Sequence, residues 1–298
     1  MRIGLVLPIA DEDGPDGQAP AYPEIRALAR AAEAGGLDSV WVFDHVLFQF
    51  DGVTTGIHEC WTILSALAEA TSQVQLGSIV MCTSFRNPAL LAKMAATLDH
   101  VSDGRLILGI GCGWHDPEYE AFGYPTDHKV GRFEEALTVI RGLIRDGRAD
   151  LDGRWVQARD AVLLPPARPD IPILIAAKRP RMLELTARHA DLWNLAWFGL
   201  PDERFETVRT ALADACATVD RDPGTLGITA GITIRYPDQI PPGRTPETSA
   251  ALDGADPEAV VAGFEAWAAV ADHLIVALDP CTPETVARLT ASVAAWRG

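Results

Sequence analysis

The sequence lacks four features that would each point to a large class of proteins. No apolar run approaches the roughly 18 residues that a helix needs to cross a bilayer, so we expect no membrane partner. The five cysteines lie far apart without a C-x-x-C pair, which favours reduced thiols in a cytoplasmic protein over a disulfide framework. The formal net charge of −16 argues against a nucleic-acid partner, because such proteins carry a basic stripe. The start of the chain, residues 1–8, has no small-residue cleavage site, and we interpret it as a strand rather than a signal peptide.

Several catalytic motifs are also absent or incomplete. The stretch 109–123, GIGCGWHDPEYEAFG, spaces its glycines as G-x-G-x-G, and Pro117 interrupts the chain shortly after the third glycine. A dinucleotide-binding loop instead needs G-x-G-x-x-G opening directly into a helix. His58-Glu59 begins like the zinc motif H-E-x-x-H, but Thr62 stands in place of the second histidine, and the sequence predicts no metal site. No G-x-S-x-G elbow presents a serine nucleophile. The glycine-rich stretch therefore serves some other purpose.

What the sequence does contain is a regular alternation of short apolar runs and helix-like segments. The apolar runs are typical of parallel strands that are covered on both faces. Strands are predicted at 3–7, 39–43, 75–81, 105–109, 172–176, 191–195, 227–235 and 273–278. Helices are predicted at 22–34, 59–71, 89–101, 131–145, 181–189, 202–219, 258–270 and 284–296.

Eight β-α units in a chain of 298 residues are the count of a (β/α)8 TIM barrel. An open doubly wound sheet would use fewer strands in the same length. We therefore expect residues 1–298 to form a single α/β barrel domain. Two further segments, 147–171 and 237–255, are predicted to be irregular insertions in loops at the C-terminal face, because both are rich in residues that favour turns.

In a TIM barrel the active site forms where the strands end at the C-terminal face. Polar and aromatic side chains follow these strand ends at Asp44, His45, Cys82, Thr83, Ser84, Trp114, His115, Glu118, Trp193, Asn194 and Trp197. Asp44 and His45 suit a metal-ligand pair, a general acid/base, or a strand end with its helix cap. The sequence alone leaves these three readings open.

A basic cluster, Lys178-Arg179-Pro180-Arg181, lies between a predicted strand and a predicted helix. A helix N-terminus presents free N–H groups and a positive partial charge, which suit a phosphate. In a chain this acidic, the cluster favours an anionic ligand, although an accidental charge run in a solvated loop is the alternative.

The run 83–123, TSFRNPALLAKMAATLDHVSDGRLILGIGCGWHDPEYEAFG, resembles the luciferase-like flavin and deazaflavin oxidoreductases. Within them it is most similar to the branch that depends on coenzyme F420. The segments 35–45, 131–144, 172–195 and 256–276 extend the resemblance over nearly the whole chain in the right order.

The resemblance implies a TIM barrel whose cofactor ring lies over the strand ends. It implies a non-proline cis peptide bond at Ile79–Val80 that presses on the ring, and a phosphate held near Lys178. This chain departs from many relatives by having Ala176-Ala177 in place of two glycines. The residues that would contact the cofactor are Ile79, Val80, Gly111, Cys112, Gly113, Trp114, Ala176, Ala177, Lys178, Arg179 and Asn194.

The catalytic residues implied by the resemblance are Asp44, His45, His115 and Glu118. Asp44 and His45 would flank the ring and the transferred hydride. Some deazaflavin relatives carry a catalytic glutamate where this chain has Trp114, so proton donation falls to His45, His115, Glu118 or the substrate itself. His45 is the preferred group, because an imidazole titrates near neutral pH.

The resemblance implies hydride transfer between C5 of coenzyme F420 and a small organic substrate, in a cytoplasmic homodimer. The first alternative is an FMN-dependent monooxygenase on the same fold, which uses oxygen and receives reduced flavin from a separate reductase. The second is a barrel that binds flavin without catalytic activity.

Overall fold

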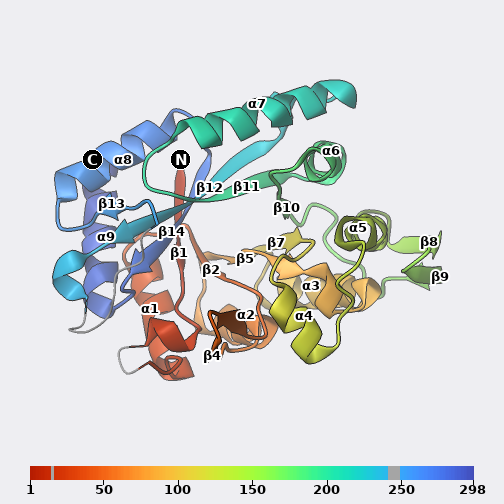
Figure 1. Ribbon diagram of the computed structural model, residues 1–298, viewed down its shortest axis with the longest axis horizontal. Helices are drawn as coiled ribbons and strands as arrows, with labels where there is room; N and C mark the ends of the chain where they lie inside the picture. The colour runs from red at the N-terminus through yellow and green to blue at the C-terminus, as the bar shows by residue number, and fades with distance from the viewer. Residues whose placement is uncertain (15–16, 241–248) are drawn as a thin grey trace.

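The computed structural model describes residues 1–14, 17–240 and 249–298. Its centre is a closed parallel barrel, and the chain is a (β/α)8 TIM barrel, as predicted (Figure 1). Around the barrel the strands follow their order in the sequence, and β14 pairs with β1 to close it. These strands are β1 (Arg2–Val6), β2 (Ser39–Val42), β5 (Gln75–Ser78), β7 (Leu106–Gly111), β10 (Ile173–Ala176), β11 (Leu192–Phe198), β12 (Gly227–Arg235) and β14 (His273–Asp279).

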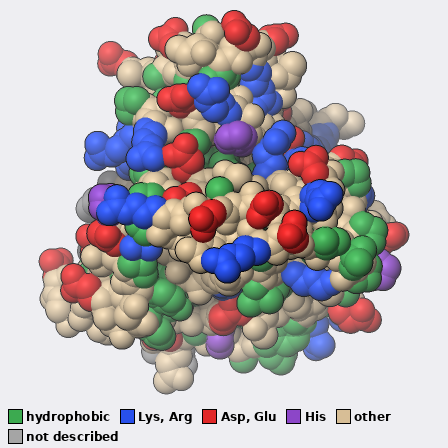
Figure 2. Space-filling model, turned by 90° about the vertical axis from the view of Figure 1, so that its right-hand side faces the viewer, with side chains coloured by type: hydrophobic (Ala, Val, Ile, Leu, Met, Phe, Trp, Pro, Cys, Tyr) green, Lys and Arg blue, Asp and Glu red, His purple; other side chains and the backbone are tan. Residues whose placement is uncertain are grey.

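The eight expected helices are all present and surround the barrel (Figure 1). They are α1 (Tyr22–Ala34), α2 (Cys60–Ala70), α3 (Pro88–Val101), α5 (Lys129–Asp146), α6 (Pro180–His189), α7 (Glu203–Thr218), α8 (Pro257–Ala268) and α9 (Pro283–Arg297). Side-chain caps determine where several helices begin. The Asn87 side chain accepts hydrogen bonds from backbone N–H groups in the first turn of α3, and the Asp256 side chain does the same for α8. Charged side chains of both signs cover the face that carries α5 and α6 (Figure 2).

The barrel interior is packed around Trp41 on β2. Its indole is fully buried and lies against apolar side chains from other strands, apart from the larger core between barrel and helices. Gly4 and Gly77 leave room for it, since a Cβ at either position would lie within 3 Å of the ring. Its N–H donates to the Ser39 hydroxyl at 2.7 Å. The interior is therefore a solid core, and ligands must bind at its ends.

Residues 148–162 form an antiparallel hairpin, so the prediction of an irregular segment there was wrong. Its strands are β8 (Arg148–Asp152) and β9 (Gln157–Val162), and it begins just after α5 ends. Glu135 on α5 accepts three backbone N–H groups from residues 154–156 in the connecting turn, which fixes the hairpin along that helix. In the second insertion, the structure forms a short strand, β13 (Leu252–Asp253), while residues 241–248 lie outside the described residues.

A second hairpin and a short helix lie at the C-terminal face, and neither was predicted. The hairpin joins β3 (Phe48–Phe50) to β4 (Val53–Thr55) through Asp51 and Gly52, which both have positive φ. Helix α4 (Asp116–Phe122) follows β7. Pro117, which we expected to interrupt the chain, lies in its first turn, where a missing N–H costs no helical hydrogen bond.

No helix in the described part of the chain is both long and apolar enough to span a membrane.

Candidate active site

A cavity of about 330 Å³ opens at the C-terminal mouth of the barrel. Side chains from the ends of several strands line it, as expected for this fold. Among the predicted site residues, His45, Ile79 and Trp114 line this cavity. The other lining residues are Val6, Leu7, Pro8, Asp13, Phe43, Phe48, Trp197, Thr233, Ser249, Ala277, Leu278, Asp279 and Cys281. Most of the wall is therefore apolar, and its titratable groups include the imidazole of His45 and the carboxylates of Asp13 and Asp279.

His45 pairs with Glu118, which α4 brings to the mouth of the barrel. The distance from His45 Nδ1 to Glu118 Oε1 is 2.9 Å. A carboxylate oxygen only accepts hydrogen bonds, so Nδ1 carries the proton and donates it to Glu118. The other carboxylate oxygen accepts the backbone N–H of Val46 at 2.9 Å. The pair leaves Nε2 of His45 as the nitrogen that can bind a ligand in the cavity.

Glu118 is only 1% exposed. A buried carboxylate needs partners for its oxygens, and both of them are paired here. The left-handed Gly123 ends α4 just beyond it, so the helix is short and its position is set by β7 and this glycine. Sequence reasoning selected Glu118 but placed it on a loop instead of a helix.

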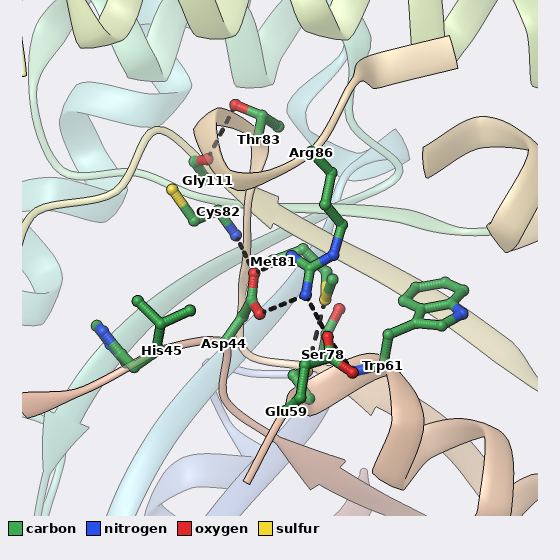
Figure 3. Close-up of polar contacts among 12 residues, drawn as sticks. Asp44, His45, Glu59, Trp61, Ser78, Met81, Cys82, Thr83, Arg86 and Gly111 are labelled. Atoms are coloured by element: carbon green, nitrogen blue, oxygen red, sulfur yellow. Dashed lines mark hydrogen bonds and ion pairs between the residues drawn. The ribbon is translucent and has the colours of Figure 1, made fainter. Parts of the chain in front are cut away.

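The Asp44 carboxylate points away from His45 and toward Arg86 (Figure 3). Arg86 binds both of its oxygens, at 2.7 and 2.9 Å, and also reaches Glu59 at 2.5 Å. The backbone N–H of Cys82 donates to the same carboxylate at 2.8 Å. Burial alone would lower the pKa of Arg86, but the hydrogen bonds to Asp44 outweigh it and raise that pKa. The pair thus joins the end of β2 to the segment that precedes α3.

His115 is buried and lies behind the cavity wall. Its Nε2 accepts the backbone N–H of Gln49 at 2.9 Å, so this nitrogen is unprotonated and Nδ1 carries the proton. Burial lowers the pKa of His115, which favours the same neutral form. Its ring lies 4.8 Å from that of Phe50. His115 therefore anchors the β3–β4 hairpin to the β7–α4 segment.

The β3–β4 hairpin places two aromatic rings beside the cavity. The Phe48 ring lies 4.4 Å from the His45 ring, and Phe50 stacks on Trp114 at 6.2 Å with an interplanar angle of 23°. The outer pair is exposed, with 51% of Phe50 and 61% of Trp114 accessible. Sequence reasoning missed both phenylalanines. The signal was the dipeptide Asp51-Gly52 within FQFDGVTT, a pattern typical of a two-residue hairpin turn.

The glycine-rich stretch makes room for the protein's own backbone. A Cβ at Gly109 would lie 1.9 Å from the carbonyl oxygen of Ser78, and one at Gly111 would lie 2.8 Å from Val80. The Ile79–Val80 peptide bond is cis, as the resemblance implied. This bulge between β5 and β6 (Met81–Cys82) thus packs directly on β7.

Gly113 must be glycine for a different reason, namely that its backbone is in the left-handed region, with φ of +74°. This left-handed conformation costs glycine no steric energy. A Cβ here would also lie 1.8 Å from the hydroxyl of Tyr119, which donates to the carbonyl oxygen of Cys112 at 3.0 Å. Gly113 therefore turns the chain from β7 towards α4.

The predicted phosphate site lies between β10 and the first turn of α6. Lys178 and Arg179 are exposed, and neither side chain forms a hydrogen bond or ion pair with the residues that the structure describes. The N–H of Ala177 donates to the carbonyl oxygen of Asn194 at 3.2 Å. The Asn194 amide is buried and donates to Thr229 at 2.8 Å. Two unpaired cations at a helix N-terminus can hold an anionic group.

Within residues 1–14, 17–240 and 249–298, no group of three or more His, Cys, Asp or Glu side chains is arranged to hold a metal ion.

Comparison with known proteins places this chain in a family. The family model described as luciferase-like monooxygenase matches residues 1–239. A phthiodiolone/phenolphthiodiolone dimycocerosates ketoreductase from Mycobacterium sp. (strain JLS) is 36% identical over 236 residues, which are 70% of this chain and 61% of the relative. The pyrimidine monooxygenase RutA of Methylorubrum extorquens is 32% identical over 206 residues, 64% of this chain and 56% of that protein. The chain thus spans about three fifths of the length of these curated relatives.

The fold is shared with a solved F420-dependent secondary alcohol dehydrogenase in complex with an F420–acetone adduct. The TM-score is 0.78 at 17% sequence identity, and the match covers 100% of this chain and 99% of that chain. A closed parallel barrel, a ligand-sized cavity at its mouth and a family match over most of its length lead to one conclusion: the chain belongs to the luciferase-like monooxygenase family.

Proposed function

We propose that the protein transfers a hydride between coenzyme F420 and the carbonyl or alcohol carbon of a small apolar substrate. The observation that carries the proposal is the His45–Glu118 pair at the edge of a cavity whose wall is mostly apolar. Interconverting a ketone and an alcohol requires a proton at the substrate oxygen as well as a hydride at carbon. An oriented imidazole can provide or remove that proton.

The residues present fit the cofactor. Lys178 and Arg179 supply two exposed cations for its phosphate, and Ile79 and Trp114 give the cavity an apolar surface for its ring. The Cβ atoms of Ala176 and Ala177 limit how closely the backbone approaches the phosphate, so the two cations take a larger share of that contact. When bound, coenzyme F420 supplies the carbon that gives or accepts the hydride.

The chain's own task is to handle the proton and exclude water. In the reductive direction, a protonated His45 donates from Nε2 to the substrate oxygen while Glu118 keeps the Nδ1 proton in place. In the reverse direction, neutral Nε2 accepts the hydroxyl proton and the imidazolium is stabilised by Glu118. Phe48 and Trp114 cover the imidazole, so that water is displaced from the reacting oxygen.

The comparisons support this choice of reaction. The ketoreductase relative acts, by its name, on a ketone, and the alcohol dehydrogenase neighbour carries an adduct of F420 with acetone. The monooxygenase relative supports a second candidate, a reduced-flavin monooxygenase that uses oxygen and FMN from a separate reductase. The cytoplasmic location and the homodimer stay predictions.

Parallel equilibrium binding of oxidised F420 and FMN, followed through tryptophan fluorescence, tests the proposal first. We expect tight binding of F420 and, with reduced F420 and a ketone, reoxidation of the cofactor. Binding of FMN alone, with oxygen uptake in the presence of a reductase, would establish the monooxygenase. Cofactor binding without turnover of any ketone or alcohol tried would favour the non-catalytic barrel.

Replacing Lys178 and Arg179 together by alanine should weaken F420 binding at least about tenfold, because charged hydrogen bonds contribute about 1.5–3 kcal/mol each. The effect should shrink as salt is added. Arg159→Ala removes an exposed arginine from β9 and serves as the matched control. Unchanged affinity in the double variant would remove these two cations from the cofactor site.

A further inference from the structure

A second hollow lies at the opposite end of the barrel from His45. It has a volume of about 660 Å³ and is bounded by the last turns of α5 and α6 and by the segment between α7 and β12. Helices in this fold run back from the C-terminal face, so their ends lie at the N-terminal face. On the face that carries α5 and α6, Lys and Arg side chains gather around a histidine (Figure 2). The basic residues that line the hollow are Arg141, Arg145, Arg188, His189 and Arg221.

Two of these arginines build the walls. Arg145 donates to the carbonyl oxygen of Ile171 at 2.9 Å and to Asp191 at 2.6 Å. Arg221 donates to the carbonyl oxygens of Ala187 and Ala190 at 3.0 and 2.8 Å. Carbonyl oxygens and the Thr225 hydroxyl accept hydrogen bonds from the N–H groups of Arg221, but none of these acceptors carries a net charge. The positive charge of Arg221 therefore still acts on the hollow.

Arg141 and His189 form no hydrogen bond or ion pair within the described part of the chain. Arg141 Nε and the ring nitrogen Nδ1 of His189 are both buried without a hydrogen-bond partner. Leaving a buried donor unpaired costs about 1–3 kcal/mol, and such groups in a native protein call for an ion or a water. The two side chains come from neighbouring helices, α5 and α6, and line the same hollow.

None of the carboxylates that the structure describes near the hollow forms a hydrogen bond or an ion pair with Arg141 or His189. Asp191 is held by Arg145 and by the N–H of Ile173 at 2.7 Å. Asp222 accepts the N–H of Gly224 at 2.9 Å as the cap of a short turn. Asp220 is exposed at the rim. Glu184 pairs with Arg188 on α6, and Glu134, which acts electrostatically on His189, pairs with Arg181. Asp146 and Asp150 line an adjoining hollow that Arg141 and His189 also line.

We infer that this hollow binds a phosphate group or an anion of similar shape. Arg141 and His189 donate hydrogen bonds to its oxygens, and Arg221 adds positive charge. A guanidinium matches the geometry of a phosphate, and charge-assisted hydrogen bonds to it are stronger than neutral ones. Inorganic phosphate and an organic phosphate monoester share this chemistry. The site is separate from the proposed cofactor phosphate site at Lys178.

Isothermal titration calorimetry with inorganic phosphate, at constant ionic strength, tests the site. We expect saturable binding to the wild-type protein and at least tenfold weaker binding to Arg141→Gln and His189→Leu. The variant that lacks Lys178 and Arg179 should keep this binding. Arg209→Gln, which removes an exposed arginine paired with Glu206 on α7, is the matched control. A parallel titration with glycerol 3-phosphate decides between the two sources, because tighter binding of the ester would identify an organic phosphate.

A second measurement covers the case of a poorly folded variant. Phosphate should raise the Tm of the wild-type protein but not that of Arg141→Gln, since only a ligand that binds the native state shifts Tm. The inference is overturned by an absence of saturable binding to the wild type, or by equal affinity in Arg141→Gln. Loss of binding in the Lys178/Arg179 variant alone would also overturn it, by placing the phosphate at the barrel mouth.

Discussion

His273 makes the stability of the barrel depend on pH. It begins β14, is fully buried, and its Nε2 lies 2.8 Å from the hydroxyl of Ser39. The Ser39 oxygen already accepts the indole N–H of Trp41, so its own proton is available to Nε2. Burial, reinforced by the positive charges of Arg2 and the N-terminal amine, lowers the pKa of His273 to about 3. The native barrel therefore holds this imidazole in its neutral form.

The unfolded chain has an ordinary histidine with a pKa of about 6.5. Between that value and about 3, the unfolded state binds a proton that the native state does not. The free energy of unfolding therefore falls as pH decreases through this window. Within this window the free energy of unfolding changes by about 1.4 kcal/mol per pH unit. Lowering the pH from about 6.5 to about 5 should therefore lower the free energy of unfolding by about 2 kcal/mol through this residue alone.

His273→Gln isolates this contribution, because glutamine keeps a hydrogen-bond acceptor for Ser39 and does not titrate. Urea unfolding followed by circular dichroism at several pH values between about 7 and 5 gives the free energy of unfolding of both proteins. The variant should be less stable near neutral pH but lose about 2 kcal/mol less than the wild type on acidification. His100→Gln, which removes an exposed histidine from α3, is the matched control. Parallel curves for wild type and His273→Gln would refute the reasoning.

Three further changes test the mouth of the barrel. Glu118→Gln removes the carboxylate that holds the Nδ1 proton of His45, so kcat for carbonyl reduction should fall about ten- to a hundredfold; a matching loss of F420 affinity would instead make Glu118 a cofactor contact. Gly109→Ala should lower the free energy of unfolding in urea by about 3 kcal/mol, because its Cβ would lie 1.9 Å from the Ser78 carbonyl oxygen; a change below about 1 kcal/mol would show that the bulge can move. Phe50→Ala removes the ring that stacks on Trp114, a contact of about 0.5–1.5 kcal/mol, so Trp114 is held less firmly in the cavity wall and KM for an aromatic ketone should rise about three- to tenfold. Its KM for acetone should stay constant, and an equal rise for both ketones would contradict a stacking role.

The barrel itself could be predicted from the sequence, because parallel strands that are buried on both faces leave continuous apolar runs. The predicted strand 227–235 matches β12, and the predicted helix 22–34 matches α1. Caps such as Asn87 fix helix starts through contacts two or three residues away, which a local pattern records.

Contacts between distant residues could not be predicted in the same way. The position of Asp44 after a strand left its role open and the resemblance implied a catalytic one, but its partner Arg86 lies 42 residues further along the chain. A sequence shows that both residues are near the mouth and does not show which acidic and basic groups pair. The β3–β4 hairpin was missed for another reason, since its strands have only three residues each and are partly exposed. Such strands leave little hydrophobic pattern.

The stretch from Gly109 to Gly123 connects these observations. Its first two alternating glycines receive the bulge at Ile79–Val80, which fixes how β7 leaves the barrel. Gly113 then turns the chain into α4, and that helix carries Glu118 to His45, 73 residues earlier in the sequence. The glycines and Glu118 thus act together, because the backbone packing that the glycines permit sets the position of Glu118 and so the orientation of the His45 imidazole. A change that shifts β7 by a few tenths of an ångström should therefore weaken the His45–Glu118 hydrogen bond without touching either side chain, because hydrogen-bond strength falls steeply with geometry.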